Sequence, residues 1–295
     1  MDTSQTPKRR YVLGYHTFAD LEPPEFVSLA AEAGYDGVTL RLWPAYKPPL
    51  EYPFPLLEPQ SPMRNEVKRR LRDTGMSVLD IEVLRVDAQL DVSSMRPLLE
   101  ASADLGGAYL TVLGNDEDQS RLDDNLAALA ELSAEYGMPI SLEFHALNSI
   151  NSIHAANAAL DRLGREDALL TVDTLHLFRS GGCAADIART DPKRLISIQL
   201  CDGPRKGPET VEAFRAESRD RQHPSLGELP LEEYVRAAPR DSAIIVEAPM
   251  IGLRQRLGLE PVVIAQDALR LTTQLVSRAD KATDDRGRTR FTAQG

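Results

Sequence analysis

Residues 134–143 read AEYGMPISLE: the end of a helical pattern, a glycine, a short turn, and a strand-like run in which apolar and polar residues alternate. The same order of features occurs three times earlier in the chain, at residues 31–40 (AEAGYDGVTL), 71–80 (LRDTGMSVLD) and 102–111 (SADLGGAYLT). Glycine directly after a helix is the residue that most easily takes the left-handed conformation found there. The repeat therefore predicts a chain in which helices and strands alternate.

Short aliphatic and β-branched runs extend this pattern to eight predicted strands, at residues 11–16, 37–42, 77–84, 108–113, 139–144, 169–173, 195–200 and 243–247. Amphipathic stretches predict helices between them, at residues 25–33, 62–74, 94–105, 121–136, 149–163 and 231–237. The spacing between strands is too long for hairpins and favours parallel crossovers. We therefore expect a single (β/α)8 TIM barrel over residues 1–276. The charged and polar residues 277–295 are predicted to form a flexible C-terminal tail.

The composition limits the classes of partner. The 295 residues carry a formal net charge of -11, which argues against binding to nucleic acid or to an anionic membrane surface. The two cysteines form no CxxC pair, and the first residues lack the apolar run of a signal peptide. We therefore expect a cytoplasmic protein. The sequence also lacks the glycine-rich nucleotide motifs and the GxSxG motif of serine hydrolases.

Four consecutive predicted strands end in an inward-facing polar side chain. Side chains of a barrel strand alternate between the interior and the surrounding helices, so the apolar neighbours of these residues face outward. The inward residues are Glu143, Asp173, Gln199 and Glu247. They lie at the C-terminal ends of the strands, where barrel enzymes build their active sites. Long segments leave the same ends, at residues 43–59, 202–227 and 249–259.

Three carboxylates that converge in one cavity repel one another and raise each other's pKa values. A divalent cation would remove this repulsion, and a set of oxygen ligands suits a hard ion. We therefore predict one bound divalent metal ion, with Mn²⁺, Mg²⁺ or Co²⁺ as the candidates. The predicted ligands are Glu143, Asp173, Gln199 and Glu247.

Motifs at the same strand ends resemble those of a known superfamily. They are LEFH (142–145), VDTLHLFRSGG (172–182), IQLCDGPR (198–205), PSLGELPL (224–231) and VEAP (246–249). Together they resemble the xylose isomerase-like TIM barrels, which include sugar phosphate isomerases and epimerases and the 3-dehydroshikimate and inosose dehydratases. The resemblance covers the whole barrel and implies ligands of the order Glu, Asp, His, Glu. Gln199 departs from the usual His and is similar to some bacterial 3-dehydroshikimate dehydratases.

The resemblance also implies roles for residues near the four ligands. His176, three residues after Asp173, corresponds to a histidine that binds substrate oxygens or moves a proton. Arg205 stands where the sugar epimerases carry an arginine that contacts substrate. Other residues are candidates because they lie at strand ends or in the loop after the seventh strand. The further candidates for substrate binding are His16, Trp43, Arg219 and Arg221. Four more residues could line the mouth of the barrel: Arg41, Glu82, Arg85 and His145.

Glu143 and Glu247 could work as a base and an acid on either side of a substrate, with His176 beside them. We therefore expect a metal-dependent isomerase or epimerase acting on a sugar, polyol ketone or keto acid through an enediolate. A dehydratase of a 3-dehydroshikimate- or inosose-like cyclic ketone is the alternative, and Gln199 favours it. A barrel that holds metal and binds a ligand without turnover remains open, and a DNA-repair endonuclease is disfavoured by the acidic charge. Relatives of this type often form homodimers or homotetramers.

Overall fold

Eight parallel strands form a closed barrel, in which each strand pairs with its neighbours in sequence and β8 pairs with β1. The computed structural model describes residues 9–43, 55–56, 58 and 61–292. Its strands are β1 (Tyr11–Leu13), β2 (Gly37–Leu40), β3 (Ser77–Val86), β4 (Tyr109–Gly114), β5 (Ile140–Glu143), β6 (Leu169–Asp173), β7 (Leu195–Leu200) and β8 (Ala243–Val246). The predicted (β/α)8 TIM barrel is confirmed, and each predicted strand overlaps an observed one.

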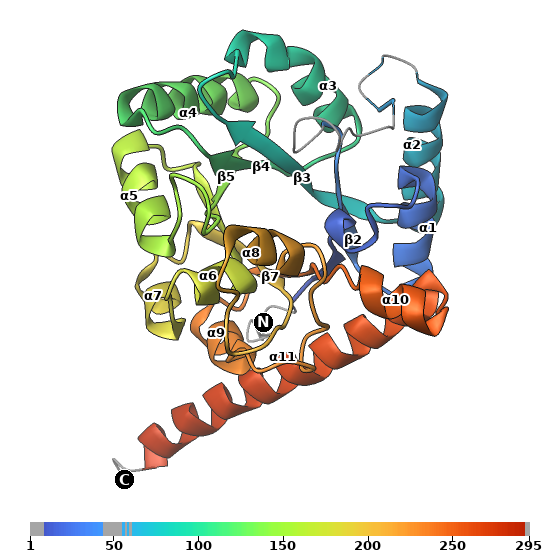
Figure 1. Ribbon diagram of the computed structural model, residues 1–295, viewed down its shortest axis with the longest axis vertical. Helices are drawn as coiled ribbons and strands as arrows, with labels where there is room; N and C mark the ends of the chain where they lie inside the picture. Colours follow the sequence, from blue (N-terminus) through green and yellow to red (C-terminus); the bar gives the residue numbers. More distant parts are fainter. Residues whose placement is uncertain (1–8, 44–54, 57, 59–60, 293–295) are drawn as a thin grey trace, which may run out of the picture.

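Helices follow the strands and surround the barrel (Figure 1). They are α1 (Pro23–Ala33), α2 (Pro62–Thr74), α3 (Arg96–Asp104), α4 (Gln119–Ala134), α5 (Ile153–Leu163), α6 (Thr174–Arg179), α7 (Ala184–Arg189), α8 (Val211–Glu217), α9 (Leu231–Ala237), α10 (Ile251–Leu257) and α11 (Pro261–Thr292). Two 3-10 helices, η1 (Tyr15–Phe18) and η2 (Val92–Met95), precede α1 and α3. The predicted glycine cap is confirmed at Gly34, which has a φ of 93° and donates to the carbonyls of Ala30 and Ala31.

The strand alternation places polar side chains inside the barrel. Ile140 and Leu142 are each 1 % exposed and belong to the apolar core that packs against the helices. Between them in sequence, Ser141 points inward and its hydroxyl lies 2.7 Å from that of Thr171. The Thr171 hydroxyl in turn lies 3.0 Å from that of Ser197. This row of hydroxyls lies one pleat below the strand ends, so the next inward residues on β5, β6 and β7 are Glu143, Asp173 and Gln199.

The last helix was not among the helices predicted from the sequence. α11 runs from Pro261 to Thr292 and extends beyond the barrel at its C-terminal end (Figure 1). Val276 and Ala279 are almost fully buried, so the helix and its packing continue past the predicted domain boundary at residue 276. The flexibility predicted for the tail stays a prediction.

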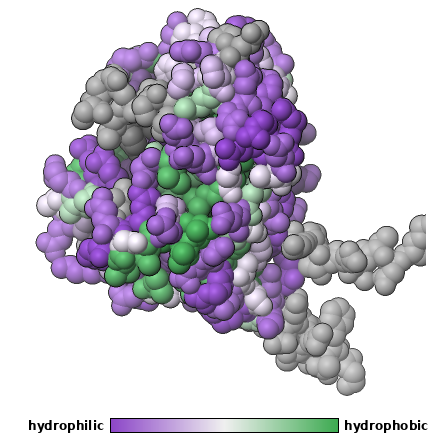
Figure 2. Space-filling view, turned by 90° about the vertical axis from the view of Figure 1, so that its right-hand side faces the viewer, coloured by the Kyte–Doolittle hydropathy of each residue, from purple (hydrophilic) through white to green (hydrophobic). Residues whose placement is uncertain are grey.

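Polar side chains cover much of the face shown in Figure 2, with an apolar area near its centre. Among the described residues, no helix combines the length and the apolar character that crossing a membrane requires.

Candidate active site

The predicted ligand residues lie together at the C-terminal ends of β5 to β8. Asp173 and Gln199 are partners in the pairing of β6 with β7. Glu143 ends β5 and Glu247 directly follows β8. The four side chains are between 0 % and 8 % exposed. Glu143, Gln199 and Glu247 line a cavity of about 1120 Å³, and Asp173 is fully buried beside them.

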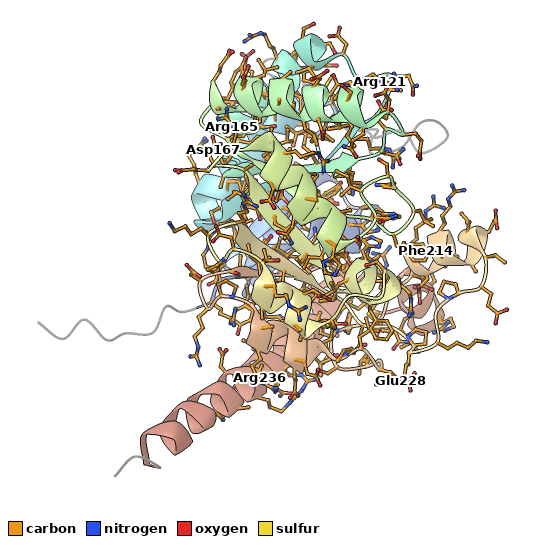
Figure 3. All side chains as sticks on the ribbon, turned by 90° about the vertical axis from the view of Figure 1, so that its left-hand side faces the viewer. Arg121, Arg165, Asp167, Phe214, Glu228 and Arg236 are labelled. Atoms are coloured by element: carbon orange, nitrogen blue, oxygen red, sulfur yellow. The ribbon has the colours of Figure 1, made fainter. Side chains whose placement is uncertain are left out.

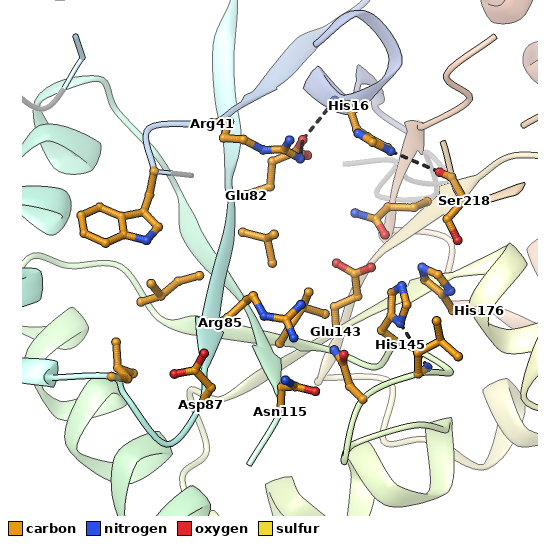
Figure 4. A pocket seen from close by; sticks show the side chains of 18 of the residues that line it. His16, Arg41, Glu82, Arg85, Asp87, Asn115, Glu143, His145, His176 and Ser218 are labelled. Carbon is orange, nitrogen blue, oxygen red and sulfur yellow. Dashed lines mark hydrogen bonds and ion pairs between the residues drawn. The ribbon is translucent and has the colours of Figure 1, made fainter. Parts of the chain in front are cut away.

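The cavity brings most of the predicted substrate-binding residues together. His16, Trp43, Arg219 and Arg221 line it, as do the four residues predicted at the mouth of the barrel: Arg41, Glu82, Arg85 and His145. Figure 4 shows several of these side chains pointing into the same space. Most of the segment at residues 43–59, predicted to follow the second strand as a functional loop, lies outside the described residues.

Arg205 is exposed and is not among the residues that line the cavity. Its backbone N–H donates to the Glu228 carboxylate at 2.9 Å, which holds this turn against the segment that follows α8. The structure therefore does not bring Arg205 to the other candidates. Arg215 of α8 lines the cavity instead, and the sequence analysis did not single it out.

Arg221 makes the shortest charged contact in the site. Its Nη1 donates to Asp173 Oδ2 at 2.6 Å and lies 3.5 Å from Glu247 Oε2. Its Nε donates to the Ser218 carbonyl at 3.0 Å. The side chain is 4 % exposed, so this is a buried ion pair rather than a contact at the rim. Sequence reasoning predicted Arg221 as a substrate contact but did not predict its pairing with a proposed metal ligand.

Two histidines and a phenylalanine pack against one another beside the predicted ligand residues. The rings of His145 and His176 lie 4.0 Å apart between centroids, and Phe214 stacks on His176 at 5.9 Å. Phe214 belongs to α8, which the sequence analysis had read as part of a long loop; it is labelled in Figure 3. Thr210 caps α8 by accepting from the Ala213 N–H, and this N-cap was the local signal for the helix.

Glu82 forms a second polar cluster in the cavity. Its Oε2 accepts from the Thr39 hydroxyl at 2.7 Å, and its Oε1 accepts from the His16 backbone N–H at 3.1 Å. Arg41 Nη2 donates to the same Oε1 at 3.3 Å. Figure 4 shows Glu82 and Arg41 on one side of the cavity, and Glu143 with the two histidines on the other. The Glu82 carboxylate is thus fully engaged by the chain itself.

The pKa values in the site follow from burial and from the charge of Arg221. Burial, then the charge of Asp173, raises the pKa of Glu143 well above its usual range, and burial also raises that of Glu247. Burial alone would raise the pKa of Asp173, but Arg221 lowers it below the usual range. Burial lowers the pKa of His176 well below 6.5 and that of His145 to about 4. Both imidazoles are therefore neutral at pH 7.

The residues present fit a divalent cation. Glu143, Asp173 and His176 each offer a ligand atom, and these atoms all lie within 4.8 Å of one another. The Oε1 atom of Gln199 is buried and accepts no hydrogen bond from the described residues, so this oxygen is available as a ligand. Carboxylate, amide and imidazole ligands suit hard and borderline divalent ions. Glu247 is not part of this group of three, which includes His176, a residue predicted from the sequence to act in catalysis.

Several solved structures have a fold similar to that of this chain. The chain is 18 % identical to the IolI protein solved with a bound zinc atom, over 92 % of this chain and 99 % of that one, with a TM-score of 0.73. It is 13 % identical to the probable 3-DHS dehydratase AsbF from Bacillus anthracis, and the match covers 90 % of this chain and 98 % of that one with a TM-score of 0.70. It is 18 % identical to D-allulose 3-epimerase from a Methylomonas species in complex with D-allulose, and the match covers 91 % of this chain and 98 % of that one with a TM-score of 0.65.

A longer structure, a fusion of a xylose isomerase-like TIM barrel with 4-hydroxyphenylpyruvate dioxygenase, matches at 16 % identity and a TM-score of 0.78; the match covers 95 % of this chain but only 45 % of that one. At these identities the likenesses show a shared fold. No curated protein matches the chain. The model of one family, described as the xylose isomerase-like TIM barrel, matches residues 27–273. The chain therefore belongs to the xylose isomerase-like TIM barrel family.

Proposed function

We propose that this chain is a divalent-metal-dependent isomerase or epimerase that moves a proton at a carbon next to the carbonyl of a small sugar, polyol ketone or keto acid. One observation carries the proposal. Glu143 and Glu247 enter a single cavity from β5 and from the end of β8, and two further ligand candidates, Asp173 and Gln199, lie on the strands between them. Two carboxyl groups on different strands can reach a substrate from different sides.

The chain's own residues would handle the proton. Glu143 and Glu247 each present a carboxyl group to the cavity, and a carboxyl group can both accept and donate a proton. One glutamate takes the proton from the substrate carbon, and the other, already protonated, donates its own proton to the same or to the adjacent carbon. The neutral ring of His176, which packs against His145 and Phe214, can donate to the substrate oxygen on which charge develops.

Glu143, Asp173 and Gln199, with Glu247 or His176, would hold the metal. When bound, a divalent cation supplies Lewis-acid polarisation of the carbonyl and its neighbouring hydroxyl. We propose Mn²⁺, Mg²⁺ or Co²⁺ as the ion, and Zn²⁺ belongs in the same trial because the IolI structure holds zinc. The cytoplasmic location and the homodimer or homotetramer predicted from the sequence stay predictions.

Solvent deuterium exchange tests the proposal. The protein is incubated in D₂O with each metal and a panel of ketohexoses, inososes and 3-dehydroshikimate, and mass spectrometry follows deuterium uptake at the carbon beside the carbonyl. We expect uptake with at least one substrate and a loss of about 100-fold or more in Glu143→Gln and Glu247→Gln. Glu131→Gln, an exposed glutamate on α4, serves as the control and should exchange normally. Full exchange in both site variants would refute the assignment.

A dehydratase is the second candidate, and Gln199 favours it because this residue replaces the usual histidine ligand. After the same proton is removed from a cyclic ketone, loss of a β-hydroxyl gives an ultraviolet-absorbing enone or catechol acid. Formation of this absorbance together with loss of substrate would identify the lyase. Deuterium uptake without any new absorbance would identify the isomerase or epimerase.

A further inference from the structure

Both oxygens of the Asp173 carboxylate are engaged within the chain. Oδ1 accepts from the backbone N–H groups of Leu175 and His176, at 2.7 and 3.0 Å. These contacts make Asp173 the N-cap of α6. Oδ2 accepts from Arg221 Nη1 at 2.6 Å, and the side chain of Asp173 is fully buried. A metal at this carboxylate would have to share or take over an oxygen that a guanidinium already holds.

Arg221 is held in place by its backbone as well as by its charge. Its N–H donates to the Pro249 carbonyl at 2.7 Å, just beyond β8. The next residue, Gln222, exchanges two backbone hydrogen bonds with Asp202, just beyond β7, at 2.8 and 3.0 Å. The segment that carries Arg221 is therefore attached to the chain just beyond β7 and just beyond β8, the strands that lead to Gln199 and Glu247. Its position beside the carboxylates is built into the fold.

The Arg221 guanidinium supplies positive charge where the proposed metal would supply it. Nη1 is within 3.5 Å of oxygens of both Asp173 and Glu247, and it also lies 3.3 Å from the Glu247 carbonyl. Two cations that share the same carboxylates in a buried site repel each other strongly, because little solvent screens them. The two cannot both make their best contact with Asp173 Oδ2.

We propose that Arg221 is a built-in counter-cation that competes with the divalent metal for Asp173 and Glu247. In the metal-free protein, the guanidinium neutralises the buried carboxylates and keeps the barrel end folded. Binding of the metal breaks the contact between Nη1 and Asp173 Oδ2, so the chain holds its metal more weakly than the same ligands would alone. This inference rests on the metal site of the proposed function, but it concerns affinity and does not depend on any substrate.

Isothermal titration with Mn²⁺ in the absence of substrate tests the competition. We expect Arg221→Gln to bind Mn²⁺ at least tenfold more tightly than the unchanged protein. Arg219→Gln is the matched control: Arg219 is an exposed arginine of the same segment that also lines the cavity, and its loss should change the affinity less than threefold. Equal or weaker binding by Arg221→Gln, or an equal gain in both variants, would overturn the proposal. Binding to neither the unchanged protein nor Arg221→Gln would overturn it too.

Thermal unfolding provides a readout independent of titration heats. Without metal, Arg221→Gln should melt at a lower temperature than the unchanged protein, and saturating Mn²⁺ should raise its Tm by more. If the variant folds only with Mn²⁺, a chelator should unfold it and leave the unchanged protein folded. Equal Tm shifts would count against the competition. A protein that shows the affinity difference but no deuterium exchange would refute the proposed function alone, and exchange with equal affinities would refute only the role of Arg221.

Discussion

Replacing Asp202 by alanine should destabilise the segment that carries Arg221. The Asp202 carboxylate is buried just beyond β7 and gathers three backbone N–H groups from the segment at residues 203–229. Oδ1 accepts from Gly203 at 2.9 Å and from Leu229 at 3.0 Å, and Oδ2 accepts from Ser225 at 3.1 Å. Ser225 has a φ of 74°, an unfavourable left-handed conformation for serine that this hydrogen bond helps to maintain.

The size of the effect follows from these bonds. A hydrogen bond to a charged group contributes about 1.5–3 kcal/mol, so three of them give an upper bound of about 9 kcal/mol. Water can replace part of this, because Asp202 borders a surface hollow that it shares with Gly227. Burial also raises the pKa of Asp202, which means that ionising this carboxylate is less favourable in the folded chain than in the unfolded one and offsets part of the gain from the hydrogen bonds. We therefore expect a loss of about 3 kcal/mol for Asp202→Ala.

Urea denaturation followed by circular dichroism measures this loss. Asp118→Ala is the control, because Asp118 is an exposed N-cap that accepts a single backbone bond from Arg121, at 3.1 Å. An N-cap of this kind contributes about 1 kcal/mol. Hydrogen exchange should also become faster at the amides of Ser225 and Leu229. A loss for Asp202→Ala no larger than that for Asp118→Ala would contradict the role assigned to this carboxylate.

Two further substitutions test the packing. Burial lowers the pKa of His223 to about 4, so stability falls as the pH drops below about 6.5, where only the unfolded chain takes up the proton. His223→Gln should reduce the difference in unfolding free energy between pH 8 and pH 5 by about 2 kcal/mol, and an unchanged difference in urea titrations would refute this. A Cβ on Gly114 would lie 2.4 Å from Cδ1 of Ile150, so Gly114→Ala should cost about 1–3 kcal/mol. Combining it with Ile150→Val should recover part of that loss, and simple addition of the two costs would count against the clash.

The parts of the site that the sequence predicted are those governed by local periodicity. Alternation within a single strand determines that Glu143 and Ser141 face inward while Ile140 and Leu142 face the helices, and this needs no knowledge of distant residues. The parallel barrel then brings the ends of β5 to β8 to the same level. Period and topology together therefore bring the four ligand candidates to neighbouring strand ends, where three line one cavity and Asp173 is buried beside them. Their role as metal ligands stays a prediction.

The contacts that the sequence could not predict are long-range. Arg221 and Asp173 are 48 residues apart, and their pairing depends on the backbone hydrogen bonds that fix Arg221 beyond β7 and β8. Arg205 and Arg221 both follow β7 and both looked like arginines of one polar loop. Only the path of the chain through α8 brings Arg221 to Asp173 and leaves the backbone of Arg205 at Glu228.

Anomalous scattering from a crystal equilibrated with saturating Mn²⁺ tests the central claim most directly, because it locates the ion without reference to any substrate. We predict an anomalous peak beside the carboxylates of Glu143 and Asp173, the Gln199 side-chain oxygen and either Glu247 or His176, with Arg221 moved off Asp173 Oδ2. A crystal with no peak in this cavity, and with the Arg221–Asp173 ion pair intact, would contradict the account.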